Sequence, residues 1–169
     1  HTSMPGAVEQ RHELGHRTVT LDEQVRRLAG LDGNAYRQAS YANVAWTLRD
    51  IGGLDASLHK ALVGAKRVAT EPEKMELYRS TGRTQQILST LQELRNNPAT
   101  PANVMTALGK MQADYVERFG KALKFAKEGA TSGKYEQDVE TYYAESQFGL
   151  ASIVTVRDAF YENADRKST

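Results

Sequence analysis

The stretch His12–His16, read His-Glu-Leu-Gly-His, has the residue types and spacing of a zinc-protease motif. In that motif two histidines one helical turn apart bind zinc, and the glutamate deprotonates a zinc-bound water. The surrounding sequence does not favour this chemistry. No strand-like segment accompanies the motif, the only later histidine is His59 on a different element, and Glu9–Val19 has no apolar stripe that would bury a metal. We therefore interpret the segment as a polar leader.

Other catalytic patterns are also incomplete. Glu9 and His12 form one Glu-x-x-His pair, whereas a di-iron bundle needs two such pairs and two more glutamates. The absence of cysteine excludes disulfides, thiolate metal sites and cysteine nucleophiles. There is no Gly-x-Ser-x-Gly, no glycine-rich phosphate loop, and no histidine within the apolar pattern that would serve as a base. We expect no catalytic residues, no metal and no cofactor.

A binding surface is a stronger candidate, in the stretch that begins at Tyr41. Small residues gather on one face there, with Trp46 and Arg49 one helical turn apart among them. Two adjacent glycines inside a helix cost about 2 kcal/mol relative to alanine, so we expect either another helix or a ligand to approach this face closely. The small residues are Ala42, Ala45, Gly52, Gly53 and Ala56.

Two interpretations of this face remain open. Trp46 is either a core anchor, with Arg49 at the surface or paired with Asp50 or Asp55, or part of a functional surface. In the second case the face is a self-association seam or a pocket for a small anion, because a guanidinium offers a planar fork to carboxylates and oxyanions.

The elements that position these residues are predicted to be helices. The first carries an apolar stripe from Tyr41 and ends near Gly64. Before Tyr41, Thr20 is a candidate cap, and we favour one extended first helix despite the glycines near residues 30–33. The stripe comprises Val44, Leu48, Ile51, Leu54, Leu58 and Leu62.

Capping signals delimit the other three helices. Thr70 and Glu73 form a predicted capping box for a second helix that ends near Asn96. Thr100 is the expected cap of a third helix, with Pro101 at its first position and its end near Gly129. Asp138 is the expected cap of the fourth.

The fold class that follows is all-α, an antiparallel up-down-up-down four-helix bundle with a long first helix. We expect residues 1–19 to be a leader that opens with a remnant of cloning, and residues 20–166 to form the domain. The 22 basic and 21 acidic residues nearly balance, which does not favour nucleic acid or an anionic membrane as a partner. No apolar run approaches the roughly 18–20 residues that span a bilayer.

Several stretches together resemble the extracytoplasmic four-helix-bundle sensor domains of bacterial chemoreceptors and sensor histidine kinases. They lie between about Tyr41 and Ala164 and read AWTLRDIGG, LYRSTGR, ADYVERFGKALKFAKEG, GKYEQDVETYYAES and GLASIVTVRDAF. The resemblance implies a periplasmic domain held between two transmembrane helices of the inner membrane. It further implies a homodimer, joined through the first helix, that binds a small molecule and transmits a helix shift.

Relatives with known ligands use arginines of the first helix, where this sequence has Arg37 and Arg49. With Trp46 and Tyr41 these are the candidate ligand-binding residues. The alternative is a helical protein-interaction module, either a secreted effector or an adaptor, which would have no flanking membrane spans.

Overall fold

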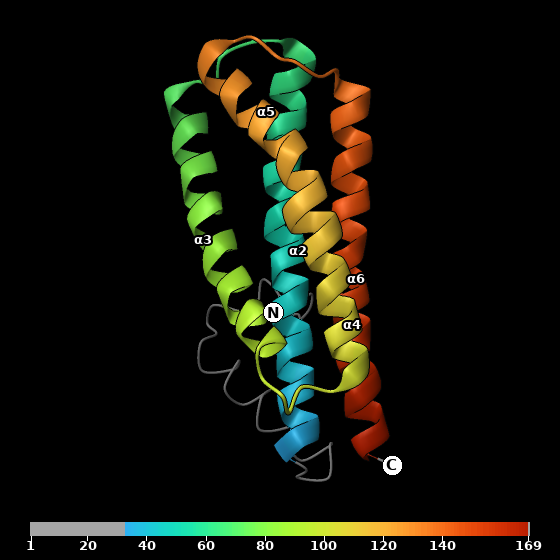
Figure 1. Ribbon diagram of the computed structural model, residues 1–169. Helices are drawn as coiled ribbons and strands as arrows, with labels where there is room; N and C mark the ends of the chain where they lie inside the picture. Colours follow the sequence, from blue (N-terminus) through green and yellow to red (C-terminus); the bar gives the residue numbers. More distant parts are fainter. Residues whose placement is uncertain (1–32, 169) are drawn as a thin grey trace, which may run out of the picture. The chain divides into compact units, whose positions relative to one another are not determined.

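The computed structural model describes residues 33–168. Every secondary-structure element in this part of the chain is a helix, as predicted, and short connections join the helices (Figure 1). The His12–His16 motif, the candidate cap Thr20 and the leader lie outside the described residues. The helices are α2 (Gly33–Ala65), α3 (Glu71–Arg95), α4 (Ala102–Met111), the π-helix η2 (Gln112–Arg118), α5 (Phe119–Ser132) and α6 (Val139–Ser168).

The chain divides into two compact units. The larger unit is Tyr41–Phe160, and residues 33–40 and 161–168 belong to the other. All features described below lie within Tyr41–Phe160, apart from Arg37.

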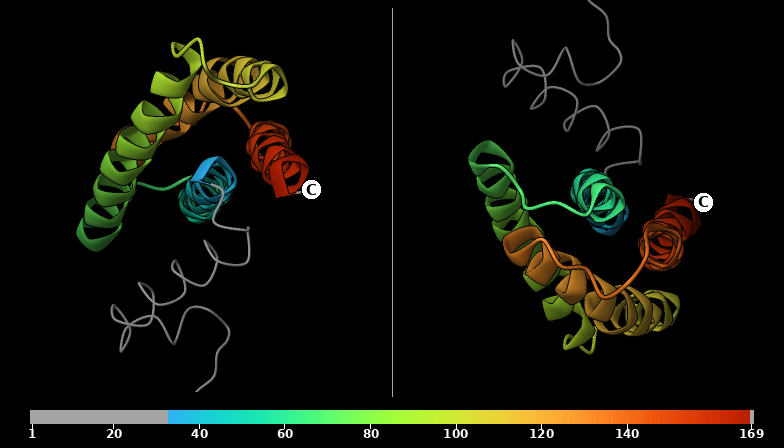
Figure 2. Two further views of the ribbon diagram at one scale, coloured as in Figure 1. Left: turned by 90° about the horizontal axis from the view of Figure 1, so that it is seen from below. Right: turned by 90° about the horizontal axis from the view of Figure 1, so that it is seen from above.

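The helices of Tyr41–Phe160 share a hydrophobic core. The end-on views of Figure 2 show these helices arranged around a common interior. Leu48 of α2, Leu91 of α3 and Ile153 of α6 are each completely buried in it. Met111 and Phe119, at the two ends of η2, join the same core. Apolar residues of all four predicted helices thus contribute to this core.

The predicted helix ends are largely confirmed. Thr70 caps α3, and its side chain accepts a hydrogen bond from the amide of Glu73, whose carboxylate accepts one from the amide of Thr70. Asp138 accepts a hydrogen bond of 2.8 Å from the amide of Thr141 in the first turn of α6. The prediction for Thr100 was wrong, because α4 begins one residue later and the Thr100 hydroxyl instead donates to the carbonyl of Leu94.

One prediction about α2 was also wrong, because Leu54, placed in the apolar stripe, is 74% exposed. Ala42 and Ala45 are completely buried in the core, which fits the close approach of another helix and not a self-association seam or a pocket at these two positions. The buried face of α2 includes Leu48 and Leu62, but between these two residues it does not include the large apolar residue Leu54.

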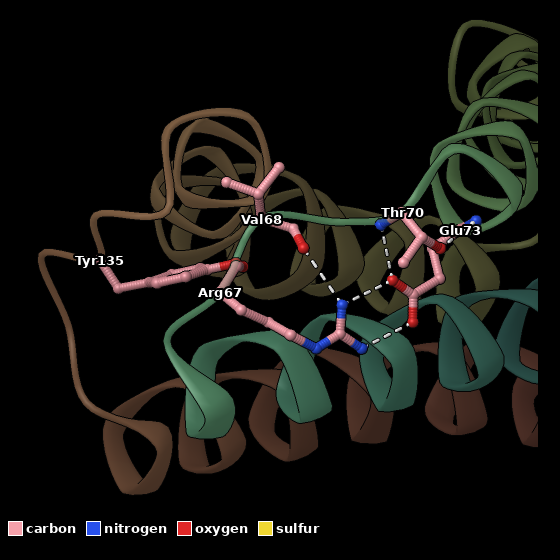
Figure 3. Close-up of polar contacts among 5 residues, drawn as sticks. All are labelled: Arg67, Val68, Thr70, Glu73 and Tyr135. Atoms are coloured by element: carbon pink, nitrogen blue, oxygen red, sulfur yellow. Dashed lines mark hydrogen bonds and ion pairs between the residues drawn. The ribbon is translucent and has the colours of Figure 1, made fainter.

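Hydrogen bonds join the α2–α3 and α5–α6 connections (Figure 3). The Arg67 guanidinium donates to both oxygens of Glu73 at 2.8 Å, and the Tyr135 hydroxyl donates to the Arg67 carbonyl at 2.8 Å. The amide of Ala69 donates to the carbonyl of Ala130 at 2.9 Å. The hydrogen bond from Arg67, and a further one from the Thr70 amide, lower the pKa of Glu73 to about 2. This end of the unit is therefore held by polar contacts between its loops.

The third predicted helix is interrupted by η2, which sequence reasoning did not foresee. In a π-helix each amide bonds to the carbonyl five residues back, so the turn is wider than in an α-helix. Tyr115 is the buried residue of this segment, and its ring stacks on Phe119 with centroids 5.8 Å apart. Such segments are rare and frequently occur at functional sites.

Candidate functional site

A groove of about 450 Å³ lies between α2 and α6. From α2 it is lined by Arg49, Gly53 and Lys60 among others, and from α6 by Tyr143 and Gln147 among others. At Gly53, which lies in its wall, an added Cβ would meet only the Arg49 Nη1 atom, at 3.8 Å. Gly53 therefore leaves open space beside a guanidinium.

The electrostatic character of the groove comes from two cationic side chains on α2. Within the described chain, neither Arg49 nor Lys60 forms an ion pair, and both instead lie over aromatic rings. The Arg49 Cζ atom is 5.6 Å from the centroid of Trp46, and the Lys60 Nζ atom is 4.2 Å from that of Tyr143. Asp50 also lines the groove.

These cations leave their charges available to an anion. The hydroxyl of Ser57 and the amide of Gln147 could add hydrogen bonds to it.

The predicted site residues are only partly brought together. Arg49 lines the groove, whereas Trp46 does not; its ring is 40% exposed and is also covered by Arg157, whose Cζ atom is 4.7 Å from the centroid. Tyr41 is half-buried against Phe160, with centroids 5.5 Å apart, and it does not line the groove. Arg37 is exposed and belongs to the other unit.

Sequence reasoning missed a polar group in the interior. It placed no histidine inside the apolar pattern, but His59 is 1% exposed, and its Nε2 atom is 3.7 Å from the Asp55 carboxylate. Burial, the largest effect, lowers the pKa of His59 although Asp55 raises it. The ring edge of Tyr142 packs on His59, with centroids 6.4 Å apart.

A sequence signal for these residues existed in their spacing. The positions 45, 48, 52, 55, 59 and 62 follow one another by steps of three and four, which keeps them on one helix face. Since Ala45, Leu48 and Leu62 are completely buried, Asp55 and His59 between them had to point inward. We had followed the large apolar residues instead, and these led to Leu54.

Among residues 33–168 there is no group of three or more potential ligands that could hold a metal ion. None of the helices in this part of the chain combines the length and the hydropathy needed to cross a membrane. Comparison of the chain with known protein families, with curated proteins and with solved structures gives no significant match.

Proposed function

We propose that this chain is the extracytoplasmic sensor domain of a bacterial membrane-bound receptor, built as an antiparallel up-down-up-down four-helix bundle. The observation that supports it best is the groove between α2 and α6, with two cationic side chains that have no ion-pair partner within the described chain. The ligand that fits this chemistry is a small carboxylate or an inorganic oxyanion, held by Arg49 and Lys60.

The short connections between the helices are consistent with antiparallel neighbours. Residues 66–70, 96–101 and 133–138 join the successive helical rods, and connections of this length are typical of bundles. In such a bundle α2 and α6 would be the helices that continue toward the inner membrane from the periplasm.

A ligand that contacts both α2 and α6 would shift the position of one helix relative to the other. It can do so only through a difference in affinity for two arrangements, typically about 1–3 kcal/mol, and helix displacements of about 1–2 Å are a known form of output. The glycine at position 53 leaves room beside Arg49 for this adjustment.

The test is a thermal-shift screen with small carboxylates and oxyanions on the wild type, Arg49→Ala and Arg157→Ala. Arg157 also lies over Trp46 but does not line the groove, so its variant is a matched control. We expect anions that stabilise the wild type and the Arg157 variant and that have little effect on the Arg49 variant. A saturating ligand at 100 times its Kd should add about 2.7 kcal/mol to the free energy of unfolding. Equal stabilisation of all three proteins would contradict a site at Arg49.

The proposed receptor would be a homodimer through the first helix. Since Ala42 and Ala45 are buried, the contacting face must be the exposed one, which includes Thr47, Leu54 and Ala61. We expect cysteines at these three positions to cross-link in the full-length receptor, where membrane tethering raises the effective concentration. Cysteines on exposed positions of α5, such as Lys124, are the control. Efficient linking through α5 alone would place the dimer contact elsewhere.

The alternative, a protein-interaction module, is favoured by large apolar side chains at the surface. Leu54, Met75 and Tyr78 are 74%, 59% and 82% exposed. If no anion binds, and a purified protein partner binds the wild type but not Leu54→Ser or Tyr78→Ser, the interaction module replaces the sensor.

A further inference from the structure

A second hollow, separate from the α2–α6 groove, opens between α3 and α5. It has two adjoining parts, of about 160 Å³ and about 270 Å³, which share Thr81 and Lys127 in their walls. Asp55 lines the first part and His59 the second, although the ring nitrogens of His59 are themselves buried. Tyr115, which η2 places in the core, is also in the wall of the first part.

Among the described residues, the Asp55 carboxylate has no lysine or arginine within ion-pair distance, although Lys127 lines the same part of the hollow. Its side chain is 11% exposed and accepts one hydrogen bond, of 2.5 Å, from the Ser80 hydroxyl. Among the described residues, His59 is the only group within ion-pair distance of Asp55. Burial lowers the pKa of His59, and the Lys127 charge lowers it too, so the ring is neutral at pH 7. A buried carboxylate without a cation is costly, which favours a cationic ligand.

The neighbouring polar atoms are able to accept hydrogen bonds. Neither ring nitrogen of His59 has a hydrogen-bond partner in the described chain, and neither does the buried hydroxyl of Tyr142. A neutral imidazole has one donor and one acceptor nitrogen. With the proton on Nδ1, Nε2 is the acceptor, and it lies 3.7 Å from the Asp55 carboxylate. The two residues then hold a negative charge and a hydrogen-bond acceptor side by side.

We propose that this hollow binds the primary ammonium group of a small molecule. An ammonium carries one positive charge and three donors, which matches the Asp55 carboxylate and the Nε2 atom of His59, 3.7 Å apart. Lys127 lines both parts of the hollow and Lys74 lines the second, and both side chains are exposed, so the rest of the ligand is either neutral or negatively charged. This site does not depend on the groove between α2 and α6 or on the function proposed for it.

The test is calorimetric titration with two probes, pentylamine and ε-aminocaproate. Both carry an ammonium on a five-carbon alkyl chain, and ε-aminocaproate adds a carboxylate at the far end. We expect at least one of them to bind the wild type, and its binding to weaken at least about tenfold in Asp55→Asn, because a charged hydrogen bond is lost. Asp158→Asn makes the same change on an exposed carboxylate of α6 and should leave binding unchanged. His59→Phe, which keeps a ring beside Tyr142, should weaken binding as well and serves if Asp55→Asn does not fold.

Lys127→Met distinguishes the two kinds of ligand. If the site accepts a ligand with a carboxylate, Lys127→Met should weaken the binding of ε-aminocaproate and leave the binding of pentylamine unchanged. If the site accepts a simple amine, pentylamine should bind the wild type more tightly than ε-aminocaproate does. Absence of binding of both probes at millimolar concentration would overturn the proposal. Equal binding to the wild type and to both the Asp55 and His59 variants would overturn it too.

Discussion

Gly52 and Gly53 are adjacent in α2, and replacing each by alanine should have opposite effects on stability. In a helix, alanine is favoured over glycine by roughly 0.5–1 kcal/mol. At Gly53 an added Cβ would meet only Arg49 Nη1, at 3.8 Å, which is ordinary contact. Gly53→Ala should therefore raise the free energy of unfolding by up to about 1 kcal/mol.

At Gly52 the same methyl group would be crowded. Its Cβ would lie 3.0 Å from the Tyr115 hydroxyl oxygen and 3.2 Å from Leu150 Cδ2. Both neighbours are buried, and Tyr115 is stacked on Phe119, so neither moves away easily. Overpacking of this kind costs about 1–3 kcal/mol, and this should exceed the helical gain. The two variants should thus differ by about 1–3 kcal/mol, with Gly52→Ala the less stable.

Urea denaturation followed by circular dichroism measures this difference, provided that both variants have the same m-value. Tyr115→Phe removes the hydroxyl that the new methyl would meet, so the double variant should recover much of the loss. If Gly52→Ala is as stable as Gly53→Ala, the Tyr115 hydroxyl is not held against Gly52, and the packing described for η2 is wrong.

Three further predictions concern titratable groups and the loops. Burial lowers the pKa of His59 below its ordinary value of 6.5, so the unfolded chain binds the proton more readily than the folded chain does. The free energy of unfolding should therefore fall as the pH drops below 6.5, and His59→Phe should flatten this part of the pH profile. Glu73 has a pKa of about 2 instead of 4.5, so its stabilising effect should be present above pH 4.5 and disappear as the pH falls toward 2; Glu73→Gln should remove this dependence, as measured by thermal unfolding against pH. Gly129→Ala would place a Cβ against the Tyr135 ring. We expect this variant to lower the melting temperature, because the displaced ring would take the Tyr135 hydroxyl away from its hydrogen bond to the Arg67 carbonyl. Tyr135→Ala in the same background should relieve the clash.

The sequence was informative where structure depends on nearby residues. The capping box at Thr70 and Glu73 and the cap at Asp138 involve residues three positions apart, so their hydrogen bonds follow from local spacing. The end of α2 near Gly64 and of α3 near Asn96 was read in the same way.

Features that depend on tertiary packing could not be predicted from local sequence. Met111, Tyr115 and Phe119 are spaced by four residues, which suits an unbroken α-helix, so nothing in this spacing indicated η2. Trp46 and Arg49 are neighbours on α2 as predicted, but only the position of α6 decides that Arg49 lines a groove while Trp46 lies under Arg157.

The π-helical segment has a consequence for how the length of this chain can vary. An α-helix turns by about 100° per residue, so an ordinary insertion or deletion would rotate everything beyond it away from the core. A wider turn instead absorbs one extra residue, and the buried faces of α4 and α5 can keep their places on either side. Deleting an exposed residue such as Ala113 should therefore preserve those faces and mainly displace Tyr115.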